Sequence, residues 1–337
     1  MKIETVEQLE EVLSEPSAAD RAVFDAIPGT LLILGVAGKM GPTLAKLARR
    51  AAPKDRRVIA VSRFSDRTVR DELEKAGLET ISCDLLKPGA LSELPDSENV
   101  IFMAGRKFGT EGEAHLTWAA NTFLPGLVAE RYRNARIVAF STGNVYPLQK
   151  IDSGGATEST PTAPVGEYAQ AALGRERMFE YGSSQWGTKV VILRLNYAVE
   201  LRYGVLVDIA LNIFNRRPVD VRNGRVNVIW QRDANSVCLR SLAHCQSPPL
   251  ILNLTGPETL SVRWIAEEFG RRFSIDPIFS GQETEYALLS DASKANAMFG
   301  APSVGPAEMM DMIAHWIEKG GRLLNKPTHF EAQDGKF

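Results

Sequence analysis

Short apolar runs alternate with segments of helical periodicity through the first 196 residues of the chain. Residues 30–34 and 58–61 are continuous apolar runs, which are typical of parallel strands buried on both faces of a sheet. The same reasoning predicts further strands at residues 79–83, 99–103, 136–140 and 189–195, and helices at residues 69–76, 115–134 and 168–186. Strands that alternate with helices of this length imply right-handed crossovers. The pattern therefore predicts an α/β fold with a doubly wound parallel sheet.

The pattern divides the chain into an N-terminal extension, a main domain, a smaller lobe and a tail, which cover residues 1–28, 29–196, 197–325 and 326–337. Thr5 followed by Gln8 predicts a capped short helix in the extension. We expect the lobe to lie over the carboxyl ends of the strands, with returns to the sheet, and the polar tail to be loosely held. Within the lobe we predict short strands at residues 226–230 and 251–254 and helices at residues 262–273 and 307–319.

Composition excludes several classes of function. The chain has 337 residues, 44% of them hydrophobic, and a formal net charge of -2, so it offers no basic face for a nucleic acid. No apolar stretch reaches the roughly 18 residues of a membrane span, and the N-terminus is acidic where a secretory signal carries Lys or Arg. Three cysteines and four histidines show no metal-ligand spacing. We therefore expect a cytoplasmic protein that binds a small molecule, with no metal, no nucleic acid and no membrane as partners.

A glycine-rich turn lies between the first strand and the first helix of the main domain. Its sequence is Gly35-Val36-Ala37-Gly38-Lys39-Met40-Gly41. In this context Gly35 permits a tight turn, Gly38 lets the backbone approach a diphosphate, and Gly41 lets the helix pack closely on the strand. We therefore predict a Rossmann domain that binds a nicotinamide dinucleotide, with contacts from Gly35, Gly38, Lys39, Met40 and Gly41.

The end of the second strand bears on the choice of cofactor. Many NAD-binding proteins carry a carboxylate here, which accepts hydrogen bonds from the ribose and repels the extra phosphate of NADP. This strand ends in Ser62-Arg63, where serine replaces the acid and Arg63 is able to give charge-assisted hydrogen bonds to a 2′-phosphate. The other interpretation of Arg63 is a solvated arginine. We favour NADP as the cofactor and keep NAD as the alternative.

Several segments, in order along residues 30–320, resemble one family. The Gly-x-x-Gly-x-x-Gly spacing resembles the short-chain dehydrogenase/reductase superfamily, and later segments are similar to its extended branch, the NAD-dependent epimerase/dehydratase family. Cys83-Asp84-Leu85 resembles the family's Asp-Leu pair beside the adenine, Met103-Ala104-Gly105 resembles the small-residue turn beside the cofactor, and Asn121 falls on a family asparagine. The resemblance implies a cofactor site that includes Asp84, Leu85, Ala104, Gly105 and Asn121.

The same resemblance implies a catalytic pair. Residues 140–146, Phe-Ser-Thr-Gly-Asn-Val-Tyr, resemble the family's FSSxxVYG segment, which makes Thr142 the catalytic hydroxyl, and Tyr168 follows at the separation of the family's tyrosine. Residues 192–196 resemble the strand and loop that cover the nicotinamide, which places Asn196 at the cofactor. The pair also makes chemical sense by itself, because hydride transfer at a carbinol carbon needs a group that moves a proton on or off the attached oxygen.

The sequence departs from the family at one position. The family tyrosine begins a Tyr-x-x-x-Lys motif whose lysine lowers the phenol pKa, but here the fourth residue after Tyr168 is Ala172. With an ordinary phenol pKa of about 10, only roughly one part in a thousand is tyrosinate at neutral pH. Either another cation substitutes, or catalysis has weakened and the protein is a dinucleotide-binding sensor or regulatory protein. The candidate cations are Lys39, Arg106, Lys107 and the positive ring of an oxidised nicotinamide.

We favour an enzyme over this sensor, and both over an interaction scaffold without a cofactor. The resemblance implies an NAD(P)-dependent oxidoreductase or epimerase/dehydratase that acts on a sugar, sugar nucleotide or related polyol. It also implies a homodimer in which the helices at residues 115–134 and 168–186 pair. In the lobe, Asp233 resembles a family aspartate in the segment that returns to the sheet. Four arginines there are candidates for holding a phosphate or carboxylate, namely Arg202, Arg216, Arg217 and Arg222.

Overall fold

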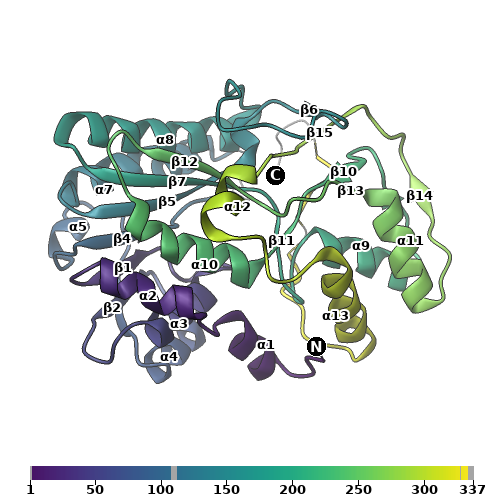
Figure 1. The fold of residues 1–337 in the computed structure, drawn as a ribbon, viewed down its shortest axis with the longest axis horizontal. Coiled ribbons are helices and arrows are strands. Elements are labelled where there is room, and N and C mark those ends of the chain that lie inside the picture. The colour runs from purple at the N-terminus through teal and green to yellow at the C-terminus, as the bar shows by residue number, and fades with distance from the viewer. Residues whose placement is uncertain (1, 108–111, 327, 333–337) are drawn as a thin grey trace.

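The main domain is built on a seven-stranded, wholly parallel sheet (Figure 1). The computed structural model describes residues 2–107, 112–326 and 328–332. The strand order is β12-β7-β5-β4-β1-β2-β3, with strands β1 Leu31–Leu34, β2 Val58–Ser62, β3 Glu79–Ser82, β4 Asn99–Phe102, β5 Arg136–Thr142, β7 Lys189–Leu195 and β12 Leu250–Leu254. The order reverses direction between β1 and β4, so the prediction of a doubly wound sheet is confirmed.

Alternate residues of the central strand β1 face two different hydrophobic cores. Leu31 and Ile33 pack into the core under α2 (Ala18–Ala26), α3 and α10, whereas Leu32 and Leu34 pack into the core under α7 and α8. Figure 1 shows these two layers of helices on opposite faces of the sheet. The helices of this domain are α3 Gly41–Ala51, α4 Arg67–Lys75, α5 Ala90–Glu93, α6 Ala114–Trp118, α7 Leu124–Arg131, α8 Gly166–Trp186, α10 Gln231–Ser241 and α12 Ser293–Phe299. Burial on both faces explains why the central strands are continuously apolar.

The smaller lobe lies beside the carboxyl ends of the strands and has its own core. Its helices are α9 Val205–Phe214, α11 Val262–Phe273 and α13 Pro306–Glu318, and their apolar faces meet in one buried cluster. Short strand pairs complete the region: β6 Gln149–Lys150 with β15 Tyr286–Ala287, β8 Ala198–Val199 with β11 Ile229–Trp230, β9 Val219–Asp220 with β14 Phe279–Ser280, and β10 Arg225–Val226 with β13 Leu260–Ser261. The single strand predicted at residues 226–230 is therefore wrong, because β10 and β11 pair with different partners. The strand predicted at 251–254 exists as β12, but it belongs to the main sheet.

The N-terminal extension ties the lobe to the main domain. It consists of α1 Val6–Leu13 and α2 Ala18–Ala26, and the Thr5 side chain caps α1 by accepting a hydrogen bond from the Gln8 amide, as predicted. Apolar residues of α1 pack into the core of the lobe, whereas those of α2 pack into the core of the main domain. The extension thereby joins both cores.

The expectation of a loosely held tail is wrong for the tail residues that the structure describes between 328 and 332. Thr328 and Phe330 are buried. The Thr328 amide and hydroxyl both donate hydrogen bonds to Asp208 of α9, at 2.8 and 2.7 Å. The Phe330 carbonyl accepts a hydrogen bond from Asn223. A buried phenyl ring and three hydrogen bonds hold this segment against the lobe, and polar composition alone gave no sign of them.

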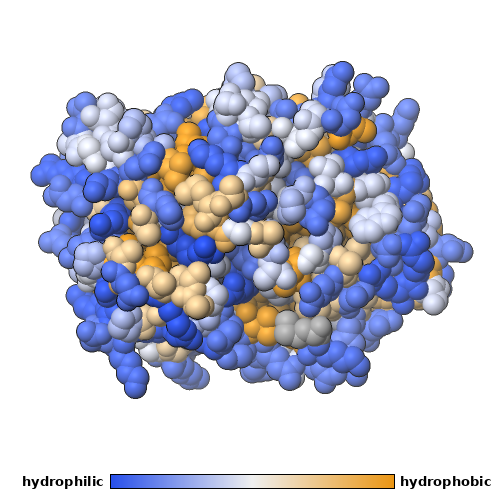
Figure 2. Space-filling view, viewed as in Figure 1, coloured by the Kyte–Doolittle hydropathy of each residue, from blue (hydrophilic) through white to orange (hydrophobic). Residues whose placement is uncertain are grey.

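The surface seen in Figure 2 is mostly hydrophilic, with apolar residues in separate patches. No helix in the described parts of the chain is long and apolar enough to cross a membrane. Within the same residues, no cluster of His, Cys, Asp and Glu has the arrangement of a metal site.

Candidate dinucleotide and catalytic site

The glycine turn lies where the strand order of the sheet reverses. Gly35 follows β1 with a φ of +88°, and a Cβ at this position would lie 2.5 Å from the Cα of Ala104, just after β4. A Cβ on Gly41 would lie 2.0 Å from the carbonyl oxygen of Val36. Both positions therefore require glycine for steric reasons, and they bring the turn, β4 and the start of α3 into close contact at the switch point of the sheet.

The tip of the turn is open and presents unused donors. Ala37 and Gly38 are exposed, and within the described parts of the chain the only heavy atom near a Cβ built on Gly38 is the carbonyl oxygen of Gly35, at 3.8 Å. Among the described residues, no acceptor is recorded for the backbone N–H groups of Ala37 and Met40. Unpaired amides at the start of a helix attract anions. The turn therefore fits the diphosphate of a dinucleotide.

Residues predicted for the adenosine end gather at the carboxyl ends of β2 and β3. Ser62 ends β2, and Arg63 and Asp84 follow the adjacent paired strands β2 and β3. The Ser82 hydroxyl donates to the carbonyl of Arg63. Asp84 is exposed and accepts a hydrogen bond from the Leu86 amide, whereas Leu85 is buried in the core. Leu85 is thus placed to shape the site mainly through packing.

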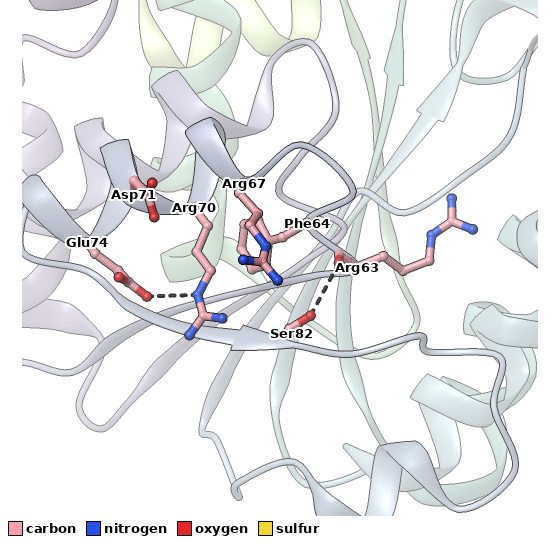
Figure 3. Close-up of a pocket in the computed structure, with 7 residues that line it drawn as sticks. All are labelled: Arg63, Phe64, Arg67, Arg70, Asp71, Glu74 and Ser82. Atoms are coloured by element: carbon pink, nitrogen blue, oxygen red, sulfur yellow. Dashed lines mark hydrogen bonds and ion pairs between the residues drawn. The ribbon is translucent and has the colours of Figure 1, made fainter.

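Three arginines surround a hollow of about 460 Å³ at this end (Figure 3). Arg70 is paired with Glu74 at 2.9 Å, whereas Arg63 and Arg67 form no ion pair with any described residue. Figure 3 shows Arg67 beside Phe64, and Arg63 extending away from Arg67 and Arg70. Arg63 is exposed and follows Ser62 directly, so its charge is available to a ligand at the end of β2.

Asn121 secures the loop that follows β4. It lies in a π-helical turn, Ala119–Phe123, that joins α6 to α7 and interrupts the single helix predicted over residues 115–134. Its side chain is fully buried, accepts a hydrogen bond from the Arg106 amide at 3.0 Å and donates to the Arg106 carbonyl at 2.8 Å. The neighbouring Ala104 and Gly105 face the glycine turn and this asparagine. A π turn in a helix often marks a functional site, and here it points the asparagine at the cofactor loop.

Tyr168 and Thr142 meet although 26 positions separate them in the sequence. Thr142 ends β5, where its hydroxyl accepts a hydrogen bond from the Asn144 amide at 3.2 Å, and Tyr168 lies in the first turn of α8. The two side chains share a hydrogen bond. Burial raises the pKa of Tyr168, and the charge of Arg175 and the hydrogen bond with Thr142 both act to lower it. Thr142 therefore caps a turn and also orients the tyrosine.

Arg175, which the sequence analysis did not single out, places a buried positive charge near Tyr168. It lies seven positions after Tyr168 on α8, two turns along the same face, and its side chain is 6% exposed. Its guanidinium donates to the Asn121 side-chain oxygen at 2.7 Å and to the Phe140 carbonyl at 2.6 Å. These contacts fix a buried positive charge between the asparagine, β5 and the tyrosine.

The space beside Ala172 is apolar. Ala172 is 1% exposed and packs against Val145, Tyr146 and Ala156. We predict that Ala172→Lys destabilises the protein by at least about 3 kcal/mol, because the longer side chain overpacks this cluster and its ammonium loses solvent. Denaturant unfolding of the unchanged protein and of Ala172→Lys measures this difference in stability. An unchanged midpoint would show that the position accommodates a lysine, as the family motif requires.

The three protein cations proposed from the sequence lie near the site in different ways. Lys107 lies 5.8 Å from the centre of the Tyr168 ring, and Lys39 lies 3.4 Å from the centre of the Tyr203 ring. Arg106 forms an ion pair with Glu113. Among the described residues, Arg175 is the cation whose charge lowers the pKa of Tyr168.

Behind the pair lies a buried polar network that the sequence analysis also missed. Glu176 accepts hydrogen bonds from the Ser141 hydroxyl at 2.5 Å and from the Arg194 guanidinium at 2.7 Å. Arg194 also donates to the Tyr146 hydroxyl, which donates to Asn253 of β12. Asn196 is buried next to this layer and donates to the Leu288 carbonyl. The network joins β5, α8, β7 and β12 and holds Thr142 and Tyr168 in place.

Three of the remaining candidates in the lobe, Asp233, Arg202 and Arg222, have structural partners. Asp233 accepts hydrogen bonds from the Ser303 amide and hydroxyl, each at 2.7 Å, and so anchors the segment before α13. Arg202 pairs with Glu10 and Glu200, and Arg222 pairs with Asp220. Arg216 and Arg217 are exposed after the end of α9.

A parallel sheet with an open glycine turn at its switch point, and a tyrosine–threonine pair at the same edge, defines a Rossmann-type dinucleotide-binding protein with a candidate acid–base site. Comparison with family models agrees. The model of the NAD dependent epimerase/dehydratase family matches residues 31–199, half of the chain. The chain belongs to this family, which confirms the resemblance seen in the sequence. The family is one of enzymes, and nothing in the comparisons supports the sensor alternative.

Solved structures share the fold at low sequence identity. UDP-glucuronic acid 4-epimerase from Bacillus cereus in complex with NAD is 16% identical, with a TM-score of 0.73 over 86% of this chain and 99% of that one. UDP-glucose 4-epimerase from Thermotoga maritima with UDP-glucose is 14% identical, with a TM-score of 0.72 and the same coverage. Pal from Bacillus thuringiensis is 17% identical, with a TM-score of 0.72. Comparison with curated proteins gives no significant match.

Proposed function

We propose that the protein catalyses nicotinamide-dependent chemistry at a hydroxyl-bearing carbon of a sugar or related polyol, as a net oxidoreduction, an epimerisation or a dehydration. The observation that supports this best is the hydrogen-bonded pair of Tyr168 and Thr142 beside the buried charge of Arg175. Family membership gives the class of cofactor. The proposal of a sugar substrate rests on the similar structures, which include the sugar-nucleotide epimerases from Bacillus cereus and Thermotoga maritima.

The proposed mechanism assigns each step to a side chain of this protein. A bound nicotinamide dinucleotide would supply hydride transfer, and the glycine turn would hold its diphosphate through backbone amides. Tyr168 would take the proton from the substrate hydroxyl and return one to the oxygen in the reverse direction. Thr142 would orient that oxygen by hydrogen bonding, and Arg175 would favour the tyrosinate form of Tyr168.

The cofactor that we propose is NADP, with NAD as the alternative. Several of the similar structures contain NAD. In this chain, however, Ser62 replaces a carboxylate that would repel a 2′-phosphate, and Arg63 is exposed and unpaired among the described residues. A guanidinium binds a phosphate well through charge-assisted hydrogen bonds.

We predict that Arg63→Ala weakens NADP binding about tenfold or more and changes NAD binding much less. Calorimetric titration with both cofactors measures the two effects. Arg70→Ala is the matched control, because Arg70 is already paired with Glu74. An equal loss of affinity for NADP and NAD in Arg63→Ala would exclude a role for Arg63 in binding the 2′-phosphate.

A homodimer in the cytoplasm remains part of the proposal. Phe123, in the π turn before α7, and Tyr181, on α8, are 59% and 55% exposed. These are large apolar side chains on the helices expected to pair, and a partner's helices would cover them. Light scattering of the purified chain would measure its mass.

The reaction is tested with sugars, sugar acids and sugar nucleotides, each supplied with NADP or NAD. Absorbance of the reduced nicotinamide reports net oxidation, and NMR of the sugar reports epimerisation or dehydration when no net absorbance change occurs. We expect turnover in at least one class. Cofactor binding without turnover in any class would contradict the proposed catalytic function.

A further inference from the structure

The C-terminal segment is anchored to the lobe. It comprises residues 321–326 and 328–332. The Leu324 amide donates a hydrogen bond to the Arg202 carbonyl, shortly before α9, at 3.1 Å. Further along, the Thr328 amide and hydroxyl both donate to Asp208 of α9, and the buried Phe330 ring packs into the core of the lobe. These contacts join the segment to the lobe at several points.

The first half of the segment passes two landmarks of the proposed cofactor site. Arg322 is close enough to Asp66, the residue that caps α4 after β2, for their charges to interact. Lys326 is close enough to Lys39 of the glycine turn for their charges to interact as well. The Lys39 ammonium itself lies 3.4 Å from the centre of the Tyr203 ring, one residue after the carbonyl that binds the segment. The segment thus passes the adenosine end and then the turn proposed to hold the diphosphate.

The second half of the segment reaches the other end of the site. Glu331 is close enough to Tyr197 for its charge to act on this phenol. Tyr197 directly follows Asn196, the residue expected at the nicotinamide. The order of residues 322, 326 and 331 along the segment therefore matches the order of adenosine, diphosphate and nicotinamide along the proposed cofactor path.

The segment borders this path without filling it. Ala37 and Gly38, at the tip of the glycine turn, remain exposed. Asn325 and His329 of the segment have φ values of +51° and +53°, a left-handed conformation that is uncommon for residues other than glycine. The anchors to the lobe therefore hold the segment in a conformation that it would rarely adopt when undocked.

We propose that the C-terminal segment is a strap that retains the dinucleotide and has to leave its anchors before the cofactor enters or leaves the site. The inference rests on the proposed function, because it requires a dinucleotide at the glycine turn. Opening the strap breaks the two hydrogen bonds to Asp208 and exposes the Phe330 ring to water, so the docked form is favoured. A segment that gates a site limits entry and exit together. Weakening its anchors should therefore speed both steps.

The test measures cofactor exchange in the full chain with intact and with weakened anchors. Phe330→Ala removes the buried ring, and Thr328→Val removes the hydroxyl that donates to Asp208. Stopped-flow nicotinamide fluorescence gives the association rates of NADPH and NADH, and displacement by excess oxidised cofactor gives their dissociation rates. We expect both rates to rise about tenfold or more in Phe330→Ala and by a smaller factor in Thr328→Val, with a much smaller change in affinity.

Phe299→Ala is the control, because it removes a buried ring from the core of the main domain and should leave both rates unchanged. Two results would overturn the strap. One is unchanged association and dissociation in a folded Phe330→Ala protein. The other is faster dissociation with unchanged association, which would make the segment a binding contact and not a gate. Either result leaves the proposed function standing, whereas a failure of the unchanged protein to bind NADPH or NADH would refute the proposed function together with the strap.

Discussion

Replacing Arg175 by methionine is expected to lower the turnover number at neutral pH by about 10- to 1000-fold and to move the rising limb of its pH profile to higher pH. Burial raises the pKa of Tyr168 and the Arg175 charge opposes this shift, so removing the charge raises the pKa further. At a pH below that pKa, each further unit by which the pKa of Tyr168 rises reduces the tyrosinate fraction tenfold. A neighbouring opposite charge commonly changes a pKa by 1 to 3 units, which sets the range. Steady-state rates across pH measure the effect.

Arg175→Lys separates charge from hydrogen bonding. It keeps the positive charge but cannot donate to the Asn121 side chain and the Phe140 carbonyl in the same geometry. We expect its pH profile to stay nearer to that of the unchanged protein, with a moderate loss of stability. A folded Arg175→Met protein with an unchanged profile would exclude a role for this charge in tyrosine ionisation.

Removing the Tyr168 hydroxyl is expected to lower the turnover number by about 10²- to 10⁴-fold, the usual contribution of a positioned acid–base group. Tyr168→Phe keeps the ring beside Lys107 and removes only the hydroxyl oxygen that is hydrogen-bonded to Thr142. Cofactor affinity should therefore change little. Tyr181→Phe is the matched control, because Tyr181 lies on the same helix and is 55% exposed. Equal rates in Tyr168→Phe and the unchanged protein would exclude Tyr168 as the acid–base group.

The sheet could be predicted because its signal is local. Central parallel strands are buried on both faces, so each appears in the sequence as an apolar run, and the glycine turn follows β1 directly. Helices after residue 196 were harder to predict: α9 of the lobe and α10 of the main domain were among those missed. The first lies among short strands without a regular pattern, and the second carries buried polar residues such as Asp233, Asn235 and Ser236 that hide its apolar stripe. The hydrogen-bond partners of these polar residues are distant in the sequence.

The candidate site was also predictable only in part. Family motifs predict Tyr168 and Thr142 as a candidate pair, whereas the Tyr-x-x-x-Lys motif ends at Ala172 and gives no sign of Arg175 three residues later. The helical repeat carries a signal, since a residue seven positions on returns to the same face. Glu176 and Arg194 gave no such sign, because their buried ion pair depends on a contact between the helix α8 and the strand β7.

Gly38→Val tests most directly whether the backbone of residues 37–41, with the open amides of Ala37 and Met40, binds the cofactor diphosphate. Gly38 has no positive φ, and the nearest heavy atom to an added Cβ is 3.8 Å away, so the fold accommodates the side chain while the approach of a ligand is blocked. Calorimetric titration with NADP and NAD, beside thermal unfolding, is the measurement. We predict an unchanged unfolding midpoint and a loss of affinity of about 100-fold or more, as expected when several charge-assisted hydrogen bonds are lost. Unchanged affinity in a folded Gly38→Val protein would contradict the claim.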